Sequence, residues 1–103
     1  MIPLLTINAV KIKTGFDTAC MTGNYECAYA LGLLSAAAGM NKEDNITDLI
    51  ELHMKVLDKL KDYEPANDAM KRLVQMLKEY EPTDKIDEQM LELYYVGFDN
   101  KSL

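Results

Sequence analysis

Few residues in this sequence could carry out acid–base or nucleophilic chemistry. His53 is the only histidine, and Cys20 and Cys27 are the only cysteines. A histidine can act as a general base or a pH switch, and a cysteine as a nucleophile. However, His53 lies between Leu49 and Leu57 on an apolar helical stripe, and no motif links a nucleophile to it. We therefore interpret His53 as a core or interface histidine that makes one hydrogen bond.

The cysteines and acidic residues form no recognisable metal or redox motif. Six residues separate Cys20 from Cys27, which fits neither a zinc knuckle nor a CxxC pair, so we interpret both as reduced thiols. The stretch 41–45 lacks the glycine and glutamate of a calcium loop. Helical carboxylate sites need Glu-x-x-His, and Ile50 stands three residues before the histidine. The sequence predicts no catalytic residue, metal or cofactor; a small enzyme or ligand-binding protein is an alternative, with its site at Cys20, Tyr25, Cys27 or His53.

The acidic charge is confined to the C-terminal part of the chain. The formal net charge is −6, whereas residues 1–40 carry two lysines, one aspartate and one glutamate and sum to zero. An acidic balance argues against direct binding to nucleic acid or to an anionic membrane, and it leaves basic proteins as partners. The N-terminus lacks the basic and long apolar regions of a secretory signal, so we expect a cytoplasmic protein.

Four acids gather near the start of the last expected helix. Asp84, Glu88 and Glu92 share one face at a four-residue spacing, and Asp87 lies beside them. A solvated face near a helix N-terminus explains such a cluster. The same residues suggest an alternative function, in which the chain is an acidic inhibitor, encoded by a phage or mobile element, that occupies a basic nucleic-acid-binding site of an enzyme.

Residues 27–40 contain no charge, and this stretch is the central element of the expected fold. A helix that is apolar on all sides belongs in the interior, and fourteen residues are too few to cross a bilayer, which needs about 20. Ala28, Gly32 and Ala36 recur every four residues and leave one face with little side-chain bulk. A neighbouring helix can approach that face closely. Core packing is our interpretation, and a dimer seam is a compatible alternative.

Apolar stripes with a 3.6-residue period predict amphipathic helices in the second half of the chain. The first is capped by Asn45 or Thr47 and ended by Pro65, and the second covers residues 66–80 and ends before Pro82. Both end in similar sequences, Leu-Lys-Asp-Tyr-Glu-Pro and Leu-Lys-Glu-Tyr-Glu-Pro. We expect antiparallel helical hairpins, each joined by a tight Glu-Pro turn.

The last helix is expected to begin at Thr83 or Asp84 and to stop at Gly97, a suitable residue just beyond a helix C-terminus. The N-terminal segment 4–14 is rich in Leu, Ile, Val and Thr and changes its apolar parity midway. This pattern favours a bulged strand or two short extended pieces, paired with another segment of this chain or of a second copy. A short helix opened by Pro3 is the alternative.

The expected fold is mainly α, a single domain over residues 1–103. Residues 1–22 are extended or irregular, with a short N-terminal strand. Residues 24–97 form a compact helical bundle of about four helices around the uncharged central helix 27–40.

Surplus apolar residues give the strongest indication of function. Leu52 and Met54 lie off the main stripe of their helix, and Leu91 and Phe98 lie on a second face of the last one. Apolar patches at a surface commonly mark interfaces. The sequence favours a non-enzymatic protein-interaction module, a small regulator, assembly factor or inhibitor of a larger complex. We expect a homodimer with a protein partner, no nucleic acid and no membrane. The predicted contact residues are Leu52, Met54, Glu88, Leu91, Glu92, Tyr94, Tyr95 and Phe98.

Overall fold

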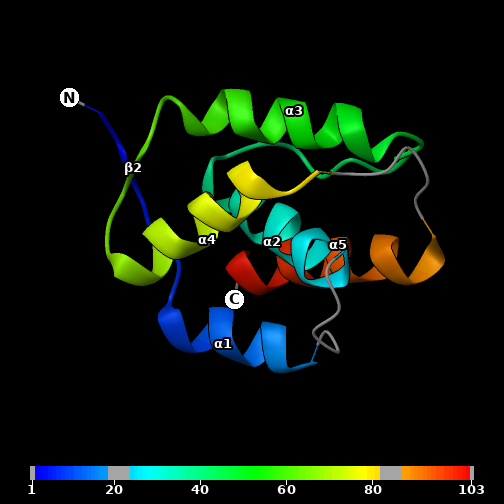
Figure 1. Ribbon diagram of the computed structural model, residues 1–103, viewed down its shortest axis with the longest axis horizontal. Helices are drawn as coiled ribbons and strands as arrows, with labels where there is room; N and C mark the ends of the chain where they lie inside the picture. Colours follow the sequence, from blue (N-terminus) through cyan, green and yellow to red (C-terminus); the bar gives the residue numbers. More distant parts are fainter. Residues whose placement is uncertain (1, 19–23, 82–86, 103) are drawn as a thin grey trace.

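The computed structural model describes residues 2–18, 24–81 and 87–102. Within these ranges the elements follow in the order β1 (Leu4–Leu5), α1 (Ala9–Thr18), α2 (Asn24–Ala37), α3 (Leu49–Leu60), β2 (Glu64–Pro65), α4 (Asp68–Glu79) and α5 (Glu88–Ser102). Figure 1 shows α2 and α5 at the centre, with the other three helices arranged around them. The chain is mainly α-helical, as predicted, with five described helices where about four were expected.

The uncharged segment forms the core helix that its composition predicts. Every residue from 27 to 35 in α2 is buried. The same core takes Ile12 from α1, Val56 from α3, Leu77 from α4 and Tyr94 from α5. One connected core therefore draws on all five of the described helices.

The small-residue face of α2 is covered by α5. A Cβ added at Gly32 would collide with the carbonyl oxygen of Tyr94, and one added at Gly97 would collide with that of Tyr29. The two helices thus touch backbone against backbone, which confirms the expected close approach. Gly97 lies inside α5 and does not end it, because the missing side chain serves helix packing there and not a helix stop. With Gly32 covered, this face leaves no room for a dimer seam.

The helices α3 and α4 begin at side-chain caps. Asp48 accepts hydrogen bonds from two backbone N–H groups in the first turn of α3, at 3.0 and 3.3 Å. Asn67 accepts one, at 2.9 Å, in the first turn of α4. The cap of α3 therefore differs from the predicted Asn45 or Thr47, since a carboxylate both accepts the free N–H groups and offsets the positive end of the helix dipole.

Glu64 and Pro65 form a strand where a tight turn was predicted. β2 pairs in parallel with β1, and Leu5 lies opposite Pro65. The N–H of Glu64 donates to the carbonyl oxygen of Pro3 at 3.0 Å, and that of Ala66 donates to the carbonyl oxygen of Leu5 at 3.1 Å. Because these donors flank Pro65, its missing N–H removes no bond from the pair. The predicted N-terminal strand has its partner within the chain.

Residues 9–18 are helical, which corrects the expectation that residues 1–22 are extended or irregular. The side chain of Asn8 accepts a hydrogen bond from the N–H of Val10 at 2.8 Å and caps α1. Ile12 is 6% exposed and belongs to the core. The β-branched residues Val10 and Ile12 favour a strand only weakly, and burial of Ile12 decides the conformation. The alternative of a short helix holds here, with Asn8 and not Pro3 at its start.

Candidate functional site

His53 is a core histidine, as its place on the apolar stripe of α3 predicts. Its side chain is 6% exposed, and its Nε2 lies 2.7 Å from the carbonyl oxygen of Leu77. Since a carbonyl oxygen only accepts, this contact requires a proton on Nε2. The ring also meets the Tyr80 ring edge to face, with centroids 5.5 Å apart. These contacts fix the imidazole inside the fold.

Cys27 is a poor nucleophile in this structure. The residue is buried in α2, and burial, aided by the negative charge of Glu26, raises the pKa of its thiol to about 12. Almost none of it is thiolate at neutral pH, and thiolate is the reactive form. Tyr25 donates its hydroxyl to Asp87 at 3.2 Å. Cys20 lies outside the described residues.

The acids on α5 serve local structure at one position and remain at the surface at two others. Asp87 caps α5 by accepting a hydrogen bond of 2.8 Å from a backbone N–H in its first turn, and α5 begins at Glu88. The predicted starts, Thr83 and Asp84, lie outside the described residues. Glu88 and Glu92 are exposed, and Asp84 lies outside the described residues. Among the residues that the structure describes, no group of three or more His, Cys, Asp or Glu side chains is placed to hold a metal ion.

Two of the predicted contact residues belong to the core. Leu52 is 4% exposed and Tyr94 is 1% exposed, and both pack in the buried cluster. Leu52 lies off the main apolar stripe of α3, but it faces residues 43–47 of the preceding connection and is buried there. Neither side chain offers a partner more than a small part of its surface, so both predictions are corrected.

Tyr95 and Phe98 hold the connection between α2 and α3 against α5. The Nζ of Lys42 lies 2.8 Å from an oxygen of Asp99, and 5.4 and 5.8 Å from the ring centroids of Tyr95 and Phe98. The Tyr95 hydroxyl donates to the carbonyl oxygen of Asp44 at 3.2 Å. An ammonium over aromatic rings is attracted to their faces. These half-buried rings are thus largely used within the chain. Leu91, on the same helix, is half-buried.

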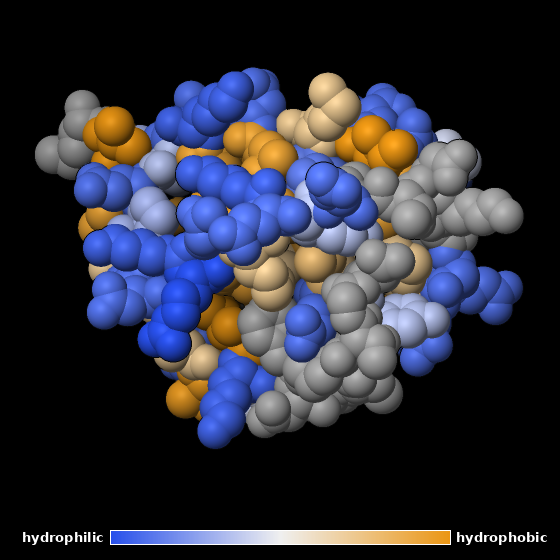
Figure 2. All heavy atoms as spheres, viewed as in Figure 1, coloured by the Kyte–Doolittle hydropathy of each residue, from blue (hydrophilic) through white to orange (hydrophobic). Residues whose placement is uncertain are grey.

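Met54 and Ile50 are the apolar residues that remain exposed on α3. Met54 is 64% exposed and Ile50 is 38% exposed, and they lie one turn apart. Figure 2 shows apolar atoms at the surface along α3 between hydrophilic neighbours. The opposite side of the same helix is buried through Leu49, Leu52, His53, Val56 and Leu60. The fold therefore uses one side of α3 and leaves Met54 and Ile50 outside it.

A shallow depression of about 500 Å³ surrounds these two side chains. Its remaining lining is charged: Asp48, Glu51, Lys55 and Asp58. We call this surface, Met54 and Ile50 with those four residues, the outer α3 face. Three carboxylates and one ammonium give its rim a negative balance.

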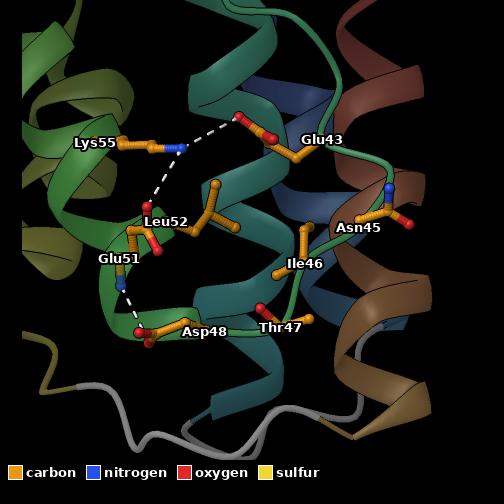
Figure 3. A pocket seen from close by; sticks show the side chains of 8 residues that line it. All are labelled: Glu43, Asn45, Ile46, Thr47, Asp48, Glu51, Leu52 and Lys55. Carbon is orange, nitrogen blue, oxygen red and sulfur yellow. Dashed lines mark hydrogen bonds and ion pairs between the residues drawn. The ribbon is translucent and has the colours of Figure 1, made fainter.

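A smaller hollow of about 120 Å³ adjoins the outer α3 face where the preceding connection meets the helix. Figure 3 shows the Lys55 side chain reaching between Glu51 and Glu43, and its Nζ lies 3.7 Å from an oxygen of each. Ile46 and Leu52 supply the apolar part of the lining. Because one ammonium group faces two carboxylates, it offsets one of their charges and leaves an acidic excess.

Ile50 is the part of this surface that the sequence prediction missed. Its spacing from Ile46 and from Leu57 fits the helical period of the apolar stripe, so the sequence alone predicts a buried residue at this position. The available signal was the four-residue spacing of Ile50 and Met54, which places both on one side of a helix.

The architecture defines the chain as a helical bundle with a short parallel strand pair, and a family model identifies it further. The model described as "Domain of unknown function (DUF3837)" matches residues 1–101. The chain belongs to this family. No curated protein and no solved structure matches this chain. Across the described ranges, the helices are too short or too polar to span a membrane.

Proposed function

We propose that this chain is a non-enzymatic protein-interaction module that binds a protein partner through the outer α3 face. The observation that carries the proposal is the exposure of Met54, at 64%, beside Ile50 in a shallow depression. Such a module would work as a small regulator, an assembly factor or an inhibitor of a larger complex.

The apolar pair is suited to contact with another protein. Burying a methionine or isoleucine side chain completely is worth roughly 1.5–3 kcal/mol, so the exposed parts of Met54 and Ile50 together offer about 2 kcal/mol or more to a complex. The methionine side chain is flexible and adapts its shape to the surface that it meets. The rest of α3 is anchored in the core, so the pair is presented on a rigid support.

The charges around the pair favour a partner with a basic rim. Asp48, Glu51 and Asp58 surround Met54 and Ile50, and Lys55 is shared between two carboxylates. Charges at the rim of an interface mainly raise the association rate and are screened by salt. We expect complex formation to slow as the ionic strength rises, with a smaller change in the dissociation rate.

Three further predictions are not tested by the structure. Sedimentation at high micromolar concentration tests the homodimer, which a strict monomer would contradict. The acidic inhibitor of a nucleic-acid-binding enzyme would require binding that is lost on charge reversal at Glu88 and Glu92, and indifference to that change would contradict it. The cytoplasmic setting is likewise a prediction.

Affinity capture with matched variants tests the proposal. The intact tagged chain is expected to capture a protein from its own organism, and Met54→Asp is expected to reduce that capture at least tenfold. Gln75→Asp places the same charge on an exposed position of α4 and should capture normally. Equal capture by Met54→Asp and by the unchanged chain would overturn the proposal, as would no capture above a tag-only control.

A further inference from the structure

A further cavity lies between the C-terminal halves of α3 and α4. It has a volume of about 300 Å³ and shares no lining residue with the outer α3 face. Its lining comes from β1, α3, β2, α4 and the turn after α3, namely Leu5, Leu57, Leu60, Lys61, Tyr63, Pro65, Val74 and Lys78. In Figure 1 β1, β2 and the C-terminal end of α3 lie at the left of the molecule, and α4 runs from there toward the centre.

The lining is apolar apart from two lysines and one tyrosine. The hydroxyl of Tyr63 is already used, because it donates to the carbonyl oxygen of Ala38 at 2.8 Å. Small-molecule sites have volumes of roughly 300–1,000 Å³, are mostly apolar, and fix the ligand with a few polar groups. This cavity therefore lies at the small end of that range. At about 30 Å³ for each water-sized group, it holds on the order of ten such groups.

The charged groups of the cavity are both positive, although the chain as a whole is acidic. Lys61 lies 3.8 Å from Asp58, but both of these side chains are largely exposed, so the attraction between them is weak. Among the ion pairs of the described ranges, Lys78 takes part in none. Both ammonium groups are thus free to meet an anion beside the apolar lining.

We propose that this cavity binds a small carboxylate with an unbranched apolar body, such as a medium-chain fatty acid. The alkyl chain lies against Leu57, Leu60 and Val74, and the carboxylate lies near Lys61 and Lys78. A ligand of about twelve non-hydrogen atoms is expected to bind with a Kd on the order of 0.1 mM.

The two lysines also lie at helix C-termini, where a positive charge offsets the helix dipole. That role accounts for the charges but not for an apolar cavity beside them. It predicts that removing the lysines lowers stability and leaves ligand affinity unchanged. The ligand proposal instead predicts that removing the lysines weakens the binding of a carboxylate and leaves the binding of an uncharged ligand unchanged.

Methyl NMR titration of the full chain with decanoate and with decanol separates these outcomes. Decanoate is expected to shift the methyl signals of Leu57, Leu60 and Val74, and to bind roughly three- to tenfold more tightly than decanol at low salt. Lys61→Gln combined with Lys78→Gln should abolish that difference. Lys71→Gln changes an exposed lysine of α4 that does not line the cavity, and the difference should persist in it.

Three results would overturn the proposal. The first is no shift of the cavity methyls below millimolar decanoate, and the second is equal affinity for decanoate and decanol in the unchanged chain. In the third, the cavity methyls respond to a captured protein partner and not to decanoate, which would assign the cavity to a protein interface.

Discussion

Gly32 on α2 and Tyr94 on α5 meet backbone against backbone, so that any side chain at position 32 would collide with the Tyr94 carbonyl oxygen. The reverse contact, Gly97 against Tyr29, lies on the same pair of helices. Because backbone atoms cannot move aside as a flexible side chain can, a Cβ at either glycine must push the helices apart. This packing keeps α2 enclosed and leaves the surface of the molecule to α1, α3, α4 and the outer side of α5.

The first prediction concerns these glycines. Gly32→Ala and Gly97→Ala should each lower the free energy of unfolding by about 1–3 kcal/mol, because overpacking outweighs the gain of about 1 kcal/mol in helix propensity. Urea unfolding followed by circular dichroism measures the change. Gln89→Ala, at an exposed position of α5, should stay within about 0.5 kcal/mol of the unchanged chain. Alanine variants as stable as the parent chain would mean that α2 and α5 do not pack in this way.

The sequence predicted the central helix because composition alone determines that an uncharged segment is buried. It predicted the close helix contact because alanine and glycine at a four-residue spacing reduce bulk on one face. It did not predict the strand at Glu64 and Pro65, since pairing with β1 depends on residues far apart in the chain. The helical start at Asn8 was missed for a similar reason: the burial of Ile12 is a tertiary effect.

A second prediction follows from buried acidic groups of raised pKa, among them Cys27 and Tyr80. Burial raises the pKa of Cys27 to about 12 from an ordinary 9.0, and that of Tyr80 to about 12 from 10.0. Above pH 9 the folded state therefore holds more protons than the unfolded state. The free energy of unfolding should fall as the pH rises from about 9 to 12.

Urea unfolding at pH 8, 9 and 10 in a Cys20→Ser background measures this fall. Adding Cys27→Ala removes one of these groups and should make the fall less steep. If the pH dependence were the same with and without Cys27, its thiol would titrate normally and would not be buried as described.

A third prediction concerns the ion pair between Lys42 and Asp99, at 2.8 Å. Lys42→Gln should leave overall stability nearly unchanged, because exposed ion pairs contribute little, but it should free the connection 40–48 from α5. Hydrogen exchange should then be faster in this connection than in the unchanged chain. Lys59→Gln alters an exposed lysine of α3 that makes none of these contacts and should leave exchange there unaltered. Unaltered exchange in Lys42→Gln would show that the contact does not hold the connection.

The candidate site was predictable only in part. Met54 could be found from the sequence because it breaks the period of its helix. Tyr95 and Phe98 look equally exposed in the sequence, yet Lys42 and the connection before α3 cover them, and no local pattern indicates that contact. Leu52 is buried by the same connection. The path of the irregular connection between α2 and α3 across the helices decides which of the surplus apolar residues stay at the surface.

The central claim is that the outer α3 face contacts a protein partner, and site-specific photo-crosslinking in the native host tests it most directly. A photoreactive residue at position 54 is predicted to give a discrete covalent adduct with one protein. The same residue at position 75, exposed on α4, should give none. An adduct formed equally from position 75, or no adduct from position 54, would contradict the account.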